Sequence, residues 1–180
     1  MKIALGTAQF GLAYGITNSN GQVSEAEVGQ LLFQADNAGI CWLDTAQAYG
    51  NAESVLGRHL PTAHGFHFIS KLPAQRQPMF SAQHVEAWDE AFRKSCQRLG
   101  VQSLDVLLLH SPADLGKPGG QHLESWLLSL RQQGLVQRIG VSIYSADDLD
   151  AVNPSLLDLV QLPLSLYDQR LLHNGTLTRL

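Results

Sequence analysis

Short runs of β-branched and aliphatic residues alternate with longer amphipathic segments along the whole chain. Consecutive parallel strands can be joined only through a crossover of about a dozen or more residues, which is usually a helix. The alternation therefore predicts βα units around a parallel sheet, and no other feature of the sequence restricts the fold as strongly. The predicted strands are Lys2–Gly6, Cys41–Asp44, His67–Lys71, Leu104–His110, Arg138–Ser142 and Leu159–Leu162.

Capping signals and helical periodicity predict helices between these strands. The first helix is opened by a capping box formed by Ser24 and Glu27. The predicted helices are one that runs from this box to about Asn37, then Ala52–Leu60, Ala82–Leu99, Gln121–Gln133, one capped by Ser145, and a last one that begins at Asp168. Because no linker or low-complexity tract separates these units, residues 1–180 are predicted to form a single domain.

The number of strands leaves two folds open. A closed parallel barrel needs eight strands and typically ~250 residues. This chain has 180 residues and signals for six strands, so a barrel would be incomplete, with about six βα units and two unpaired edges. An open doubly wound sheet accommodates six strands without that penalty. The positions of the functional residues have to decide between the two.

Composition excludes several classes of partner. The chain is 44% hydrophobic, carries a formal net charge of -4 and has no long Lys/Arg run, so neither nucleic acid nor an anionic membrane surface is expected to bind it. No stretch approaches the ~20 apolar residues of a membrane span. Cys41 and Cys96 belong to no CxxC motif, which predicts two reduced thiols and a reducing cytoplasm.

Four polar residues stand at or just after the ends of predicted strands. Asp44, Lys71 and His110 end three successive strands, and Tyr49 lies five residues beyond Asp44. The loops that follow the strands of a parallel βα protein meet at one edge of the sheet, where such proteins hold their active sites. A carboxylate, a phenol, an ammonium and an imidazole are therefore expected to converge there.

These residue types together suit the reduction of a carbonyl group. Hydride addition leaves an alkoxide, so an acid has to deliver a proton to the oxygen. Tyr49 is the expected acid, and an adjacent Lys71 ammonium is expected to lower the phenol pKa from its usual value of about 10. Asp44 would hold Lys71 in place and charged, and His110 would orient the substrate oxygen.

Each residue also has an ordinary structural interpretation. Asp44 would serve as a loop or helix-cap carboxylate and Tyr49 as a turn aromatic. Lys71 would be a solvated cation at a strand end, and His110 a loop histidine with its hydrogen bonds satisfied. The occurrence of all four at the same predicted edge favours the functional interpretation. His64 and His67 have no further ligand cluster nearby, so no metal site is predicted.

The sequence resembles the aldo/keto reductase family, and the resemblance covers nearly the whole chain in family order. The segments that carry it are Gly6-Thr7-Ala8-Gln9-Phe10-Gly11, Asp44-Thr45-Ala46-Gln47-Ala48-Tyr49-Gly50, Ile69-Ser70-Lys71, Leu108-Leu109-His110-Ser111, Ile139-Gly140-Val141-Ser142 and Val160-Gln161. The resemblance implies a TIM-type (β/α)8 barrel, here incomplete. It also implies NADPH as cofactor, with NADH as the alternative, and an aldehyde or ketone as small-molecule substrate.

The resemblance assigns site residues as well. The family's catalytic tetrad falls on Asp44, Tyr49, Lys71 and His110. Its contacts to the nicotinamide carboxamide fall on Ser142 and Gln161, while Thr7 and Asp44 lie beside the cofactor. The loops that line the substrate pocket are expected to include Phe10, Tyr14, Trp42 and Tyr167.

The chain departs from the family pattern in two respects. Ile143 follows Ser142 where the family often has Asn, and the last two strands, with the loop that holds the cofactor's pyrophosphate and 2′-phosphate, have no counterpart. Two hypotheses follow, an NADPH-dependent carbonyl reductase and a catalytically inactive partial barrel that acts as an interaction module. An unrelated open-sheet binding protein is a third, and the sequence carries no signal for an oligomeric state.

Overall fold

The computed structural model describes residues 3–61 and 64–180, and six parallel strands form its sheet. The strands pair in chain order, each with the next, so every crossover leads to a neighbouring strand. They are β1 (Ala4–Gly6), β2 (Trp42–Asp44), β3 (His67–Leu72), β4 (Leu104–Leu109), β5 (Val136–Ser142) and β6 (Leu159–Gln161). All six predicted strands are confirmed, although Lys2 lies outside the described residues.

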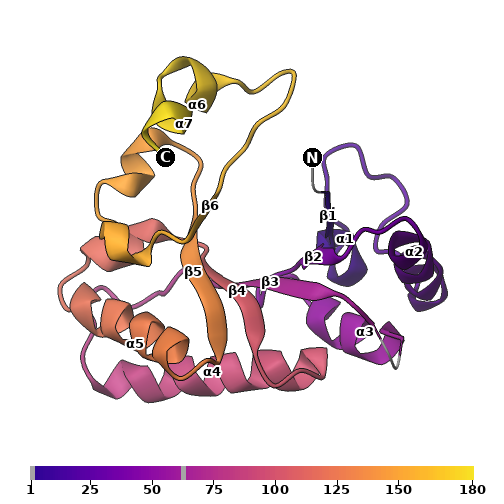
Figure 1. Ribbon diagram of the computed structural model, residues 1–180, viewed down its shortest axis with the longest axis horizontal. Coiled ribbons are helices and arrows are strands. Elements are labelled where there is room, and N and C mark those ends of the chain that lie inside the picture. The colour runs from indigo at the N-terminus through magenta and orange to yellow at the C-terminus, as the bar shows by residue number, and fades with distance from the viewer. Residues whose placement is uncertain (1–2, 62–63) are drawn as a thin grey trace.

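The sheet curls into a half-barrel, so the prediction of an incomplete TIM-type barrel is confirmed (Figure 1). Sequential order without a reversal excludes the open doubly wound alternative, in which the strand order changes direction. Within the described chain β1 pairs only with β2 and β6 only with β5, which leaves one edge of each strand unpaired. The order in which the strands pair therefore selects the incomplete barrel over the open doubly wound sheet, a choice that the number of strands could not make.

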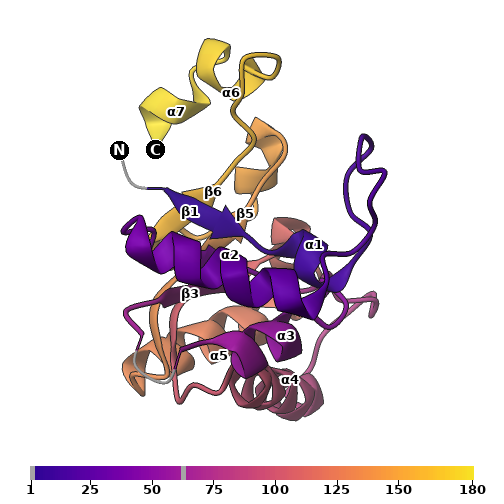
Figure 2. The ribbon, with the colours of Figure 1, turned by 90° about the vertical axis from the view of Figure 1, so that its right-hand side faces the viewer.

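Helices cover the outer face of the half-barrel. Successive helices α2 to α5 contact one another around this face, and α4 and α5 lie beneath the sheet in the view of Figure 1. A view from the side shows α2 below β1 (Figure 2). The helices are α1 (Ala8–Gly11), α2 (Glu25–Asn37), α3 (Ala52–His59), α4 (Gln83–Leu99), α5 (Gly120–Gln132), α6 (Arg170–His173) and α7 (Thr176–Arg179). No helix in the described ranges has the length and apolar character needed to cross a bilayer.

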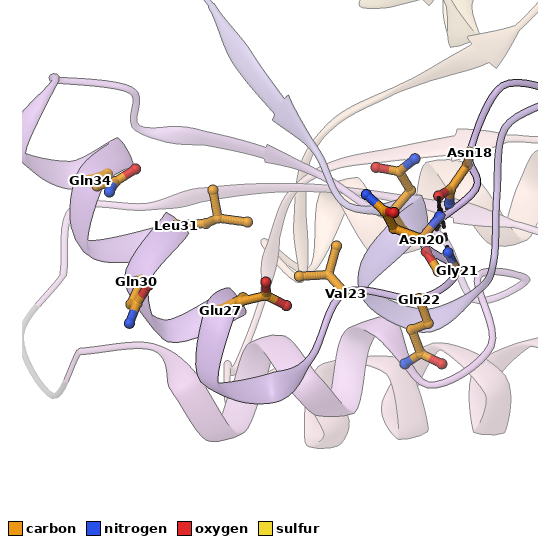
Figure 3. Close-up of a pocket in the computed structure, with 10 residues that line it drawn as sticks. Asn18, Asn20, Gly21, Gln22, Val23, Glu27, Gln30, Leu31 and Gln34 are labelled. Carbon is orange, nitrogen blue, oxygen red and sulfur yellow. Dashed lines mark hydrogen bonds between the residues drawn. The ribbon is translucent and has the colours of Figure 1, made fainter.

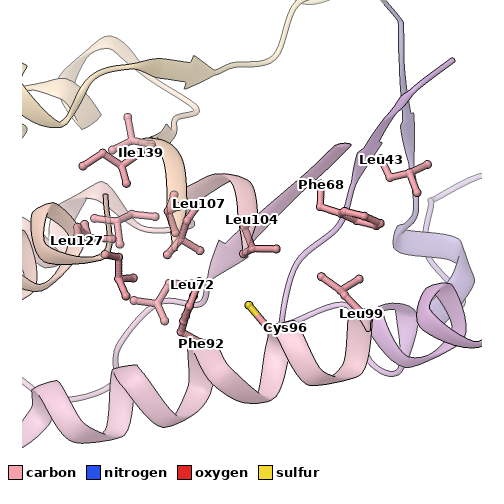
Figure 4. Close-up of a cluster of buried hydrophobic side chains, with 14 of the residues drawn as sticks. Leu43, Phe68, Leu72, Phe92, Cys96, Leu99, Leu104, Leu107, Leu127 and Ile139 are labelled. Carbon is pink, nitrogen blue, oxygen red and sulfur yellow. The ribbon is translucent and has the colours of Figure 1, made fainter. Parts of the chain in front are cut away.

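The main core lies between the sheet and these helices. Leu43, Phe68, Leu107 and Ile139 point outward from four different strands (Figure 4). They meet Phe92, Cys96 and Leu99 from α4 and Leu127 from α5, and all eight are at most 7% exposed. Alternate residues of each strand are therefore committed to the core, which leaves the opposite set to line the inner face.

Both cysteines are free thiols, as predicted. Burial raises the pKa of the Cys96 thiol to about 11, and the nearby Glu53 carboxylate acts in the same direction. A thiol with so high a pKa stays protonated and unreactive, so Cys96 contributes to core packing and takes no part in catalysis.

The C-terminal helices differ from the prediction. The Ser145 capping box is present, but it opens only a 3₁₀ turn over Ala146–Leu149. Pro154 disfavours helical backbone at Asn153, so a helix from Ser145 has no room to extend beyond that residue. The expected helix from Asp168 is divided into α6 and α7 by Gly175, whose φ of +79° is incompatible with a continuous helix. The α1 turn was not predicted.

Substitution of Gly140 tests how closely the backbones of β5 and β6 approach each other. A Cβ at this position would lie 1.8 Å from the Leu159 carbonyl oxygen, whereas a Cβ on Gly6 in β1 would meet nothing within 4 Å. Gly140→Ala should therefore lower the free energy of unfolding by roughly 1–3 kcal/mol in urea denaturation. Gly6→Ala is the matched control, and an equal loss in both variants would contradict this account.

Candidate active site

One cavity of about 230 Å³ opens where the strands end, and it collects most of the predicted site residues. Six of the seven predicted residues line it. They are Asp44, Tyr49, Lys71, His110, Ser142 and Gln161. Each comes from the carboxyl end of a strand or from the loop directly after it, because all strands run in the same direction and finish at one end of the half-barrel. The site residues therefore converge because the strands are parallel.

A buried ion pair forms the floor of this cavity. The Lys71 Nζ lies 2.7 Å from Asp44 Oδ1 and donates a second hydrogen bond to the Thr45 carbonyl oxygen at 2.9 Å. Lys71 is only 1% exposed, and this desolvation lowers its pKa, while the Asp44 carboxylate acts in the opposite direction. The carboxylate is what makes a buried ammonium tolerable here.

Tyr49 stands over this ion pair with its ring half-buried. The Lys71 Nζ lies 5.2 Å from the ring centroid, and the His110 ring meets Tyr49 edge-on with centroids 5.8 Å apart. The net fall that the sequence predicted for the Tyr49 pKa is not found. Burial, followed by the charge of Asp44, raises this pKa to about 12. Lys71 directs its hydrogen bonds to Asp44 and Thr45, so within the described residues none reaches the phenol.

His110 lies directly after β4 with its amide bonded to the Leu72 carbonyl oxygen at 2.9 Å. Burial lowers the pKa of its half-buried imidazole, and the positive charge of Lys71 lowers it further. The ring is therefore neutral at neutral pH and carries one N–H donor and one acceptor. A neutral N–H can hydrogen-bond a carbonyl oxygen without competing for its proton.

Thr7 contacts the backbone of Asp44 but lies outside the cavity. It is completely buried, its hydroxyl donates to the Asp44 carbonyl oxygen at 3.0 Å, and its amide donates to the same oxygen at 2.9 Å. It does not line the cavity, so the structure does not bring it together with the other six residues. Its observed contact holds the end of β2 in place.

Ser142 and Gln161 offer unused polar atoms to the cavity. Neither side chain makes a hydrogen bond within the described part of the chain, although Ser142 is only 6% exposed. The Gln161 backbone oxygen is already taken by the Ile143 amide at 2.8 Å, which leaves its side-chain amide free. A hydroxyl and an amide side by side match the donor and acceptor pattern of a carboxamide ligand.

Sequence reasoning missed part of the cavity wall. Ile143, Tyr144, Leu162 and Pro163 also line it. These residues follow β5 and β6 immediately, so the rule that placed His110 at the edge of the sheet could have found them. Of the residues expected in the pocket, Phe10 is buried in the core. Trp42 opens β2 at the opposite end of the sheet and stacks on His67 with centroids 4.7 Å apart.

A larger cavity of about 590 Å³ lies away from these residues, beside α2, and is lined mainly by amides (Figure 3). Its Asn18 side chain donates to the carbonyl oxygens of Tyr14 and Gly21, and its Gln9 side chain also donates to Tyr14. These amides are occupied in shaping the loop before α2. No titratable pair comparable to Lys71 and Asp44 lines this cavity, so its size does not make it the reactive site.

A second buried carboxylate lies on the other side of β3. Glu53 of α3 is 2% exposed, pairs with Arg98 at 2.6 Å and accepts hydrogen bonds from Ser70 and Ser95. Ser70 precedes Lys71, so the two point to opposite faces of the strand. The Glu53 cluster therefore joins α3, β3 and α4 outside the half-barrel. No group of three or more metal-binding side chains occurs in the described ranges.

The chain is similar to one family of known proteins. The model of the Aldo/keto reductase family matches residues 2–177. An aldo-keto reductase of Mycolicibacterium vanbaalenii is 34% identical over 141 residues, which cover 73% of this chain and 46% of the relative. One from Mycobacterium avium is 34% identical over 138 residues, covering 73% of this chain and 44% of the relative. The chain thus spans about half the length of the curated relatives it matches.

Solved structures show the same fold. A crystal structure of an aldo-keto reductase from Pseudomonas aeruginosa superposes with a TM-score of 0.75 at 25% identity, covering 97% of this chain and 68% of that one. The Bombyx mori aldo-keto reductase, solved in complex with NADP, has a TM-score of 0.67 at 24% identity and covers 97% of this chain and 59% of that one.

The charge of Lys71 gives a pH-dependent prediction for His110. Because this charge lowers the His110 pKa, Lys71→Met should raise it toward the usual value of about 6.5 in an NMR titration of the imidazole protons. Lys94→Met is the control, since Lys94 pairs with Glu90 on the exposed surface of α4. An unchanged or lower His110 pKa in a folded Lys71→Met variant would contradict the geometry.

The same shift predicts how stability depends on pH. The folded-state pKa of His110 lies below its unfolded value, so the unfolded chain takes up the proton first. The contribution of His110 to stability is therefore complete above about pH 6.5 and falls as the pH drops through the folded-state pKa. Lys71→Met should make this fall shallower in urea denaturation measured across that range.

Proposed function

Since this chain belongs to the aldo/keto reductase family, we propose that it forms the catalytic part of an enzyme that reduces an aldehyde or ketone to an alcohol. Family and fold support an oxidoreductase in general terms. The observation that carries the specific proposal is the convergence of Asp44, Tyr49, Lys71 and His110 on one cavity. A proton donor, a neutral hydrogen-bond donor and a buried cation in one place suit a reaction that creates negative charge on oxygen.

In this proposal Tyr49 is the acid. Its raised pKa keeps the phenol protonated at neutral pH, so the proton is available for transfer. An alkoxide is a stronger base than a phenolate, so the proton moves from Tyr49 to the substrate oxygen as negative charge develops there. The Lys71 ammonium, 5.2 Å from the ring centroid, then stabilises the phenolate that remains.

The other two members of the tetrad position these groups. The Asp44 carboxylate holds Lys71 at 2.7 Å and keeps its charge inside the protein. Neutral His110 donates a hydrogen bond to the carbonyl oxygen and fixes its direction relative to Tyr49. Orientation of this kind lowers the activation free energy because the reacting atoms are already held in the geometry that the reaction requires.

The free side chains of Ser142 and Gln161 fit a nicotinamide cofactor, whose carboxamide needs both a donor and an acceptor. When bound, such a cofactor supplies the hydride. We take NADPH as the cofactor, with NADH as the alternative, and the NADP complex of the Bombyx mori relative supports this choice. The remaining proposals are that Thr7 and Asp44 lie beside the cofactor and that the protein works in a reducing cytoplasm, which the free thiols support.

A second candidate is an inactive partial barrel that serves as an interaction module. The unpaired edges of β1 and β6 favour it, because open edges readily pair with another polypeptide. A panel of aldehydes and ketones with NADPH and with NADH separates the two candidates. Oxidation of either cofactor that depends on the carbonyl supports the reductase, whereas its absence across the panel favours the module.

Tyr49→Phe removes the proposed acid and leaves the ring in place. We expect kcat for carbonyl reduction to fall by roughly 10²- to 10⁴-fold, with cofactor affinity nearly unchanged. Tyr167→Phe is the matched control. The sequence placed Tyr167 in the substrate pocket, but in the structure it is fully exposed on the loop after β6 and does not line the cavity. Normal turnover in Tyr49→Phe would exclude Tyr49 as the acid.

Ser142→Ala and Gln161→Leu test the cofactor contacts. Each removes hydrogen-bonding atoms worth about 1 kcal/mol, so each should weaken NADPH binding by roughly fivefold. Ligand-observed NMR measures this even when binding is weak. Ser155→Ala and Gln137→Leu, both at exposed positions, should bind NADPH as the unmodified chain does. If both pairs of variants behave alike, the carboxamide does not bind at Ser142 and Gln161.

A further inference from the structure

The imidazole of His110 takes its direction from the loop that carries it. Within the described residues its ring makes no hydrogen bond, and it packs edge-on against Tyr49 with centroids 5.8 Å apart. Its amide donates to the Leu72 carbonyl oxygen at 2.9 Å, which fixes the start of the loop. The chain then enters a 3₁₀ helix over Pro112–Gly116, a form with poorer hydrogen-bond geometry than an α-helix. The position of the ring therefore depends on what holds this loop.

Asp114 is a buried carboxylate of this loop that the proposed reaction does not use. The residue is 2% exposed, and its oxygens have different partners. Oδ1 lies 2.7 Å from Lys117 Nζ, and Oδ2 accepts a hydrogen bond from the Gln75 amide at 2.9 Å. The ammonium makes the buried charge tolerable, and the hydrogen bond crosses to the loop after β3. Asp114 therefore joins the loop that carries His110 to the loop that follows Lys71.

Gln75 is itself firmly held at the other end of this bridge. Its carbonyl oxygen accepts from Lys117 Nζ at 2.6 Å, and its side-chain oxygen accepts from Trp88 Nε1 at 2.9 Å. Trp88 belongs to α4 and is 3% exposed, so the bridge ends in the core. The two loops meet again at Gly119, where a Cβ would lie 2.1 Å from the Phe80 carbonyl oxygen. These contacts leave the loops little freedom to separate.

We propose that Asp114 is a positioning residue, which acts through the loop backbone to hold the His110 ring against Tyr49. This inference rests on the proposed reductase function and adds a residue to the groups that serve it. Asp114 does not line the cavity, so its effect on the reaction passes through His110. A shift of the loop by about 1 Å would turn the imidazole donor away from the carbonyl oxygen, and misplacement of this size can lower a rate by about 10²-fold.

Asp114→Ala removes the bridge. We expect kcat for carbonyl reduction to fall by roughly 10- to 100-fold, with the Kd for NADPH nearly unchanged, because the carbonyl oxygen loses a fixed hydrogen-bond donor. Asp114→Asn keeps an oxygen for the Gln75 amide and should show a smaller fall in the same direction. If the alanine variant does not fold, the asparagine variant decides.

Asp105→Ala is the matched control. Asp105 lies at the opposite end of β3 and β4, where it accepts a hydrogen bond from the Phe68 amide at 2.8 Å and pairs with His67 at 2.7 Å. Its loss removes a carboxylate with the same kinds of partner, and urea denaturation measures the stability that each variant loses. Turnover by Asp105→Ala should be unchanged. An equal fall of kcat in both alanine variants would attribute the effect to lost stability and overturn the positioning role.

An NMR titration of the His110 imidazole tests the inference without the reaction. Burial and the charge of Lys71 lower its pKa, Asp44 acts in the opposite direction, and Tyr49 packs on the ring. A ring released from this position becomes more exposed and moves away from Lys71. In Asp114→Ala the His110 pKa should therefore rise toward the usual value of about 6.5, whereas Asp105→Ala should leave it unchanged.

The kinetic and NMR measurements separate this inference from the proposed function. A fall of kcat together with a rise of the His110 pKa, in the Asp114 variants and not in Asp105→Ala, supports the positioning role. An unchanged His110 pKa in folded Asp114 variants, or an unchanged kcat in an active enzyme, overturns it. If the unmodified chain reduces no carbonyl in the panel but Asp114→Ala still raises the His110 pKa, the positioning of His110 stands and the reductase does not.

Discussion

The buried ion pair between Lys71 and Asp44 is the interaction on which the site depends. An ammonium that is 1% exposed would be severely destabilising without a carboxylate, and Asp44 lies 2.7 Å away. The pair holds a positive charge 5.2 Å from the Tyr49 ring centroid. Burial lowers the pKa of His110, and the charge of Lys71 lowers it further. Loss of one partner would leave a buried, unpaired group, so the contributions of the two residues to stability are not additive.

The fold supplies the rigidity that this pair requires. Thr7 donates two hydrogen bonds to the Asp44 carbonyl oxygen, which ties β1 to the end of β2. On the outer face of β3, Glu53 binds Ser70, the neighbour of Lys71, and joins it to Arg98 of α4. The strand ends that carry Asp44 and Lys71 are therefore each held by contacts outside the ion pair itself. Catalytic side chains on strand ends held in this way keep their geometry better than side chains on free loops.

Much of the fold could be predicted from the sequence because βα alternation and capping signals are local. The Ser24 capping box, the six strands and the strand-end positions of Asp44, Lys71 and His110 all follow from short-range patterns. The errors also have local causes. Pro154 limits how far a helix from Ser145 could extend, and Gly175 divides the last helix. The contact between the Thr7 hydroxyl and the Asp44 carbonyl oxygen joins residues 37 positions apart, so no local pattern could predict it.

The sequence by itself determined the order of the βα units and the chemical groups that stand at their ends, since both follow from spacing along the chain. Tertiary structure alone decided which of these groups share a cavity and how strongly they are desolvated. The pKa of Tyr49 shows the difference. An ammonium nearby was expected to lower it, yet burial and the charge of Asp44 raise it to about 12. Solvent exclusion and distances between groups set a pKa, and both exist only after the strands have curled into the half-barrel.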